Sequence, residues 1–171
     1  MMKVGDNTYP NVAALLTGLS AGDREGDRSE VTNVTDYNTL PFIWKHYNRH
    51  PQCVTYYNED YPLINTFNYF KTGFRSPPTH VYSRPYWMAM SLLGYSDQVG
   101  CAAGQTSYQL QLESLKQFLL RYKHNCTFSL MFHVRWGHTS EINDISAVDT
   151  DLANCNNTHS SRQKLFWIHK H

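Results

Sequence analysis

A threonine hydroxyl lies near the start of a predicted helix, in the segment Thr8-Tyr9-Pro10-Asn11. Proline is favoured at the first helical position, helix-forming residues follow it, and Gly18 is a typical stop, so we expect a helix over 10–17. Thr8 would then lie at the positive end of the helix dipole, where free backbone N–H groups bind anionic esters. Asn11 can add a side-chain donor to the same oxygens. The alternative, commoner on helix statistics alone, is that Thr8 caps the helix.

A threonine hydroxyl by itself is a poor nucleophile at neutral pH. Coordination to a metal ion activates such a hydroxyl, so the segment makes chemical sense with acidic or histidine ligands brought from elsewhere. His138 follows an apolar run and is one candidate. It can equally be an ordinary loop histidine after a strand.

Other charged residues have structural and functional interpretations. We interpret Glu59 and Asp60 as solvated turn carboxylates, with a binding role secondary. Arg84 lies among aromatic residues, where it can stack or pair structurally or, less simply, bind an anion. The terminal His169-Lys170-His171 is expected to be disordered, with adventitious metal affinity.

Hydrophobic patterning predicts strands that alternate with helices. Strands are expected over 54–57 and 128–136, the second covered on both faces, and helices over 40–50, 86–93, 107–123 and 142–152. The 86–93 helix has the composition of a buried one, and the 107–123 helix should lie flat on a sheet. The segments 20–38 and 71–85 are expected to be loops. The order predicts an α/β fold with a mostly parallel sheet flanked by helices.

Composition limits the classes of partner. The 171 residues suit about one domain, and 15 Lys+Arg against 14 Asp+Glu give a net charge of +1, which excludes nucleic-acid binding by bulk charge. No apolar run is long enough for a membrane span, and the first residues lack the apolar core of a signal peptide.

The cysteines and the N-glycosylation sequons give information about the cellular compartment of the protein. Four cysteines without a CxxC pair allow one or two disulfides and give no support to a zinc finger. Sequons begin at Asn33, Asn125 and Asn156, and they would be glycosylated only in the secretory pathway. Together these features modestly favour an oxidising compartment.

The segment 8–18 resembles the nucleophile region of the alkaline phosphatase superfamily. Its phosphodiesterases have Thr-Phe-Pro-Asn followed by a run to Val-Thr-Gly, and this chain has Thr8-Tyr9-Pro10-Asn11 and Leu15-Leu16-Thr17-Gly18 at the same separation. The resemblance implies that Thr8 is the nucleophile and a metal ligand, and that Asn11 contacts the phosphate. It also implies that His138 is a metal ligand or contacts the substrate.

Most of the chain is similar to an uncharacterised, mainly animal sulfatase-like family, domain of unknown function two-two-nine. The similar segments are 3–18, 40–44, 55–74, 78–87 and the strand that ends at Gly137-His138. The resemblance implies a partial alkaline-phosphatase-like domain over 1–152, truncated at both ends, and a divergent, disordered tail over 153–171.

Departures from these families bear on the reaction. Sulfatases have Gly-Lys where this chain has Glu59-Asp60, and Thr8 cannot become formylglycine, so phosphate mono- or diesters are favoured over sulfate esters. Val134 stands where the phosphodiesterases have a metal-binding Asp. An Asp on a preceding strand and a later Asp-His-Gly, which hold the first metal in these families, are not in this sequence. We therefore expect a fragment that is inactive alone.

Two functional hypotheses follow. In the first, the full-length parent is a hydrolase of small phosphoesters that uses a divalent metal, zinc by resemblance. In the second, the protein is a non-catalytic secreted or cell-surface module that binds a glycan or a protein. Both place the parent in the secretory pathway, outside the cell or anchored to a membrane, and neither fixes the oligomeric state.

Overall fold

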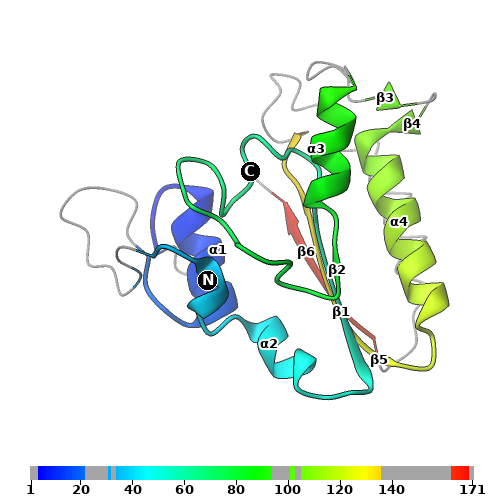
Figure 1. Cartoon of the computed structure of the whole chain (residues 1–171), viewed down its shortest axis with the longest axis horizontal. Helices are drawn as coiled ribbons and strands as arrows, with labels where there is room; N and C mark the ends of the chain where they lie inside the picture. The colour runs from blue at the N-terminus through cyan, green and yellow to red at the C-terminus, as the bar shows by residue number, and fades with distance from the viewer. Residues whose placement is uncertain are drawn as a thin grey trace.

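A parallel four-stranded sheet in the order β2-β1-β5-β6 forms the centre of the computed structural model, which describes residues 4–21, 31, 34–93, 101–102, 105–135 and 163–169. Helices α1 and α2 lie on one side of this sheet and α3 and α4 on the other (Figure 1). The predicted α/β class with a parallel sheet flanked by helices is therefore confirmed. The elements are α1 (Thr8–Thr17), the 3-10 helix η1 (Tyr37–Thr39), α2 (Ile43–Asn48), β1 (Cys53–Glu59), β2 (Val81–Tyr82), α3 (Arg84–Leu92), β3 (Cys101–Ala102), β4 (Gln105–Thr106), α4 (Ser107–Arg121), β5 (Cys126–His133) and β6 (Gln163–His169).

Residues at the helix ends explain where α1 and α4 begin and end. Helix α1 begins at Thr8, two positions before the expected start, and ends where Gly18 adopts a left-handed φ of 74° and donates its N–H to Ala14 O. Helix α4 begins with a capping box in which the Thr106 side chain accepts from Gln109 N–H and the Gln109 side chain accepts from Thr106 N–H. The predictions for 10–17 and 107–123 are confirmed to within two residues.

Alternation along the strands separates two apolar layers. Tyr57, Phe128 and Leu130 pack with residues of α1 and α2 on one face of the sheet. Tyr56 and Met131 face the opposite side and pack with α4. The prediction of an interior strand covered on both faces is confirmed, since β5 pairs with β1 and β6 and is buried from Thr127 onward.

The prediction of a buried helix over 86–93 is wrong. In α3, Trp87 is buried, whereas Tyr86 and Leu92 are 46% and 84% exposed. The reason is that α3 reaches the sheet through Trp87, whose indole N–H donates to Asn58 Oδ1 at 2.7 Å. The expected loop at 71–85 contains β2, and the expected helix over 142–152 lies outside the described residues.

The expected disorder over 153–171 does not hold at Gln163–His169. These residues form β6, which runs parallel to β5 with Phe166 opposite Leu130. Their run of aromatic and branched residues fits a strand.

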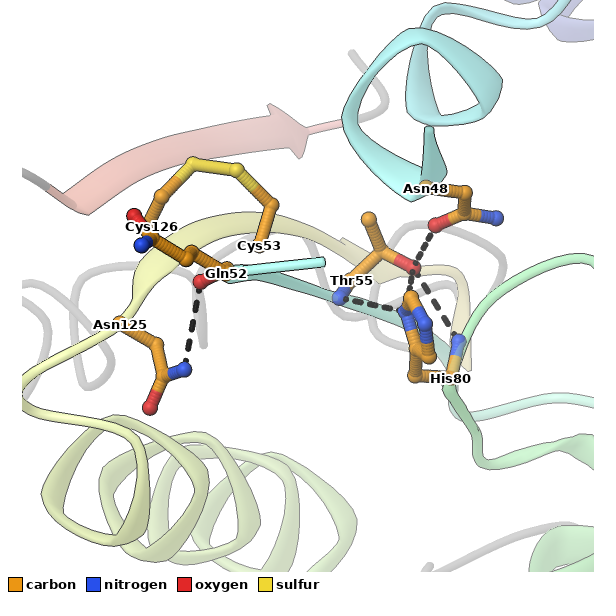
Figure 2. Close-up of a disulfide and its surroundings, with 7 residues drawn as sticks. All are labelled: Asn48, Gln52, Cys53, Thr55, His80, Asn125 and Cys126. Carbon is orange, nitrogen blue, oxygen red and sulfur yellow. Dashed lines mark hydrogen bonds between the residues drawn. A yellow bond between two sulfur atoms is a disulfide. The ribbon is translucent and has the colours of Figure 1, made fainter. Parts of the chain in front are cut away.

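A disulfide and two hydrogen bonds of Thr55 fix β1 near its start, and all three are drawn in Figure 2. A disulfide joins Cys53 and Cys126, the first residues of β1 and β5, which are register partners. Close to it, Thr55 N–H donates to His80 Nδ1 at 3.2 Å, and Thr55 Oγ1 donates to Asn48 Oδ1 at 2.7 Å. One disulfide agrees with the expected one or two; Cys155 lies outside the described part, and Cys101 is described as backbone.

Across the described ranges, no helix combines the length and apolar character needed to cross a membrane.

Replacing both Cys53 and Cys126 by serine should lower the free energy of unfolding by about 4 kcal/mol. The disulfide spans 73 residues, and removing it restores the conformational entropy of that loop in the unfolded chain. Urea unfolding under non-reducing conditions measures the change. With a reductant present the two proteins should become equally stable, and equal stability without the reductant would contradict the assignment.

Candidate functional site

The predicted nucleophile lies at the start of α1. Thr8 is the first residue of α1 and is partly exposed, and the preceding Asn7 makes no side-chain cap to the helix. The prediction that Thr8 itself caps the helix therefore does not describe this structure. Instead, its hydroxyl belongs to the first turn, beside N–H groups that an α-helix leaves without intrahelical acceptors.

The Asn11 side chain organises the backbone that leads to Thr8. Its Oδ1 accepts from Val4 N at 2.8 Å, and its Nδ2 donates to Gly5 O at 2.8 Å and to Asn7 O at 2.6 Å. Both amide hydrogens are thus directed at backbone carbonyls. Asn11 is a positioning residue here, and contact with a phosphate would require it to give up one of these bonds.

A pair of tyrosines anchors the first turn of α1. The hydroxyls of Tyr9 and Tyr37 are 2.9 Å apart, and burial raises the pKa of both. Lys71 Nζ lies 3.9 Å from the centre of the Tyr9 ring. This cation–π contact helps to hold the Tyr9 ring in place.

Glu59 and Asp60 are not solvated, which corrects the sequence interpretation. They are 2% and 0% exposed, because β1 ends between the loop that follows it and the start of α4. A carboxylate in such a place needs several donors, and each of them has three.

Glu59 is held by its own strand and by the following loop. Tyr57 OH donates to Oε2 at 2.6 Å, Thr66 Oγ1 donates to Oε1 at 2.5 Å, and Thr66 N–H donates to Oε1 at 3.2 Å. Burial nevertheless raises the pKa of Glu59 above its ordinary value of 4.5, since desolvation outweighs these hydrogen bonds.

Asp60 joins three elements. Its Oδ1 accepts from Val134 N at 2.8 Å and from Arg135 N at 3.1 Å, and its Oδ2 accepts from Ser107 Oγ at 3.1 Å. The carboxylate therefore connects the end of β1 with the end of β5 and the start of α4. Val134 contributes its backbone N–H to this connection.

Asn58 forms a polar cluster with Glu59 and Asp60 and connects it to α3 and α4. Its Oδ1 accepts from Trp87 Nε1 of α3 and from Gln111 Nε2 of α4, at 2.7 and 3.1 Å. Sequence reasoning missed the cluster, although a signal was present: three polar residues follow an apolar strand. The carboxyl ends of parallel strands meet at one edge of a sheet, where polar groups from several elements converge.

The structure describes some of the remaining candidate residues. Arg84 donates from Nη2 to Pro62 O at 3.3 Å, and an anion-binding role for it stays a prediction. Asn125 is partly exposed in the turn before β5. His138, Asn33 and Asn156 lie outside the described residues.

An open groove lies on the other face of the sheet from α1. It has a volume of about 690 Å³ and is lined by Tyr56, Val81, Ser114, Gln117, Phe118, Leu120, Arg121 and Tyr122. It contains neither Thr8 nor Asn11, so it does not belong to the predicted site.

Metal ligands do not gather within the part of the chain that the structure describes: no three His, Cys, Asp or Glu side chains there are arranged to hold an ion. The described residues therefore do not form a zinc site by themselves.

The family model described as "Protein of unknown function (DUF229)" matches residues 1–165. The chain belongs to this family. The match includes residues 153–165, part of the tail that we expected to diverge from DUF229. Comparison with curated proteins and with solved structures found no match.

Substitution of Asp60 in this DUF229 chain tests the connection between β1, β5 and α4. Asp60→Ala should lower the free energy of unfolding by about 3 kcal/mol or more, because two buried N–H groups and a buried hydroxyl lose their acceptor. Chemical denaturation measures this loss. Asp60→Asn should cost less since it keeps Oδ1, and Glu113→Ala, on the exposed face of α4, should change stability by no more than about 0.5 kcal/mol. Equal effects of Asp60→Ala and Glu113→Ala would contradict the assignment.

Glu59 should give the stability a distinct pH dependence. Because its pKa is higher in the folded state, the folded protein keeps a proton that the unfolded chain releases, so its contribution to stability falls as pH rises above 4.5 toward the raised value. Glu59→Gln should remove this fall. Unfolding free energies of the two proteins across this pH range provide the measurement, and a wild-type contribution that grows with pH would contradict it.

Proposed function

We propose that this chain carries the nucleophile segment of a metal-dependent phosphoester hydrolase related to the alkaline phosphatase superfamily, with Thr8 as the nucleophile. The observation that carries the proposal is the partly exposed Thr8 in the first turn of α1, where the N-cap residue Asn7 makes no side-chain capping bond, within a parallel α/β fold. An open helix start favours an oxyanion through its N–H groups and its dipole.

The residue type at position 8 bears on the class of ester. The hydrogen bonds of Asn11 give the backbone before Thr8 a defined shape. Threonine in place of cysteine or serine rules out formylglycine, so we propose phosphate mono- or diesters rather than sulfate esters as substrates.

A divalent metal, zinc by resemblance, would make the Thr8 hydroxyl nucleophilic. We propose that its other ligands come from His138 and from parts of the protein beyond the described residues. The chain's own described contribution is then to present Thr8 and to hold the helix start in place through Asn11 and Tyr9.

The second candidate is a non-catalytic module that binds a glycan or a protein. Two observations favour it: both amide hydrogens of Asn11 are engaged by carbonyls, and Glu59 and Asp60 are structural at the position where sulfatases have a substrate-binding lysine. Metal content separates the candidates. Stoichiometric zinc or manganese in the purified protein supports the hydrolase, and its absence supports the binding module.

For either candidate we propose an oxidising, secretory compartment. The Cys53–Cys126 disulfide supports this, because disulfides persist mainly in secreted and extracellular proteins.

Thr8→Ala should abolish phosphoester hydrolysis in the longest form of the protein that contains these residues. Loss of a nucleophile lowers turnover by at least about 10⁴-fold, and Thr8→Ser, which keeps a hydroxyl, should retain measurable turnover. The assay uses aryl phosphate monoesters and diesters, with an aryl sulfate for comparison, in the presence of zinc or manganese.

Thr17→Ala is the matched control for this experiment. Thr17 lies at the other end of α1, where its hydroxyl donates to Ala13 O, so the substitution perturbs the same helix without touching its start. Activity retained in Thr8→Ala would remove Thr8 from the mechanism. A wild-type protein inactive toward every ester would favour the binding module.

A further inference from the structure

The sequon Asn125-Cys126-Thr127 overlaps the disulfide, and we propose that the two modifications follow a fixed order. Asn125 receives an N-linked glycan before Cys53 and Cys126 join, and closure of the disulfide ends access to the site. The contacts in Figure 2 and the strand pairing support this order, which rests on the proposed secretory compartment and is independent of the proposed hydrolase.

Asn125 can carry a glycan in the folded protein. It is partly exposed in the turn between α4 and β5, and its Nδ2 donates to Gln52 O at 3.2 Å (Figure 2). The side-chain amide has two hydrogens. Attachment of a sugar replaces one, so the other can keep the bond to Gln52.

Thr127 cannot be recognised in the folded protein. Glycan transfer requires contact with the hydroxyl of the third sequon residue as well as with the asparagine. Thr127 is 0% exposed and lies between Val54 of β1 and Gln163 of β6. Its hydroxyl is buried and has no hydrogen-bond partner among the described residues, so it is not accessible at the surface.

The disulfide prevents the start of β5 from opening. Cys126 is bonded to Cys53, and Cys126 N–H donates to Gln52 O at 3.1 Å, the carbonyl that also accepts from Asn125. Peeling the sequon away from β1 would expose Thr127, but the covalent link holds the strand ends together. Reduction of this bond is therefore a condition for modification.

Glycan transfer and disulfide closure each conserve atoms and electrons with reactants of known chemical class. Glycan transfer forms a bond from Asn125 Nδ2 to C1 of the first sugar and breaks the bond from C1 to a lipid-linked diphosphate, which leaves as the Nδ2 proton passes to a base. Closure oxidises two thiols to a disulfide. The two electrons and two protons pass to a disulfide-bearing oxidant by thiol exchange.

The experiment presents the purified full chain to a solubilised oligosaccharyltransferase with a lipid-linked oligosaccharide. One sample is reduced and unfolded, the other oxidised and folded, and mass spectrometry quantifies the Asn125 glycopeptide. We expect the glycopeptide in the reduced sample and its loss in the oxidised one. Cys53→Ser removes the link but leaves all three sequon residues intact, and it should yield several-fold more glycopeptide than the oxidised wild type.

Equal modification of the reduced and oxidised wild type would overturn the proposal, and so would no modification in either. A folded Cys53→Ser protein modified no better than the oxidised wild type would overturn the role of the disulfide. If that variant does not fold, the comparison of the two wild-type samples decides. Asn125→Gln identifies the glycopeptide, because it must lose the signal in every sample.

Discussion

The parallel pairing of β1 with β5 is the constraint on which the described fold depends. Parallel neighbours cannot be joined by a tight turn, so the intervening chain must cross over the sheet, and α4 is the last part of that crossover. The pair is fixed at both ends by side chains: the Cys53–Cys126 disulfide at the amino ends, and the Asp60 carboxylate at the carboxyl ends. Between these points the strands contribute one apolar layer to each face.

The buried polar groups that stabilise the fold and the candidate nucleophile Thr8 lie in different parts of the structure. The polar cluster at the carboxyl end of β1 is buried, and its carboxylates are occupied by donors from β5, α4 and the loop after β1. Thr8 remains accessible because it lies on α1, whose buried residues Val12, Ala13 and Leu16 fasten the helix to the other apolar layer. The member of DUF229 described here thus combines buried polar groups at the end of a parallel sheet with a partly exposed hydroxyl at a helix start.

Predictions from sequence succeeded where the signal is local. The apolar spacing of 107–123, the continuous apolar run at 128–133 and the Gly18 stop each depend on neighbouring residues, and each element is present. Asp60 could not be placed in this way, because the amides that hold it are 74 and 75 residues away. The disulfide partner of Cys53 was equally open, since four cysteines allow three complete pairings. Asn11 was assigned as a ligand contact, and its hydrogen bonds to backbone carbonyls depend on how residues 4–7 fold back.

The imidazole next to β2 has a consequence for association between molecules. Strand β2 has two residues and lies at one edge of the described sheet, so the amide of Thr55 on β1 extends past its end. A backbone donor left open at a sheet edge is a template for a strand from another chain. His80 Nδ1 accepts from that Thr55 N–H, and the backbone N–H of His80 donates to the Thr55 hydroxyl. The His80 side chain therefore protects this stretch of the sheet edge from edge-to-edge aggregation. Without it, a longer β2 would be needed to pair the Thr55 N–H.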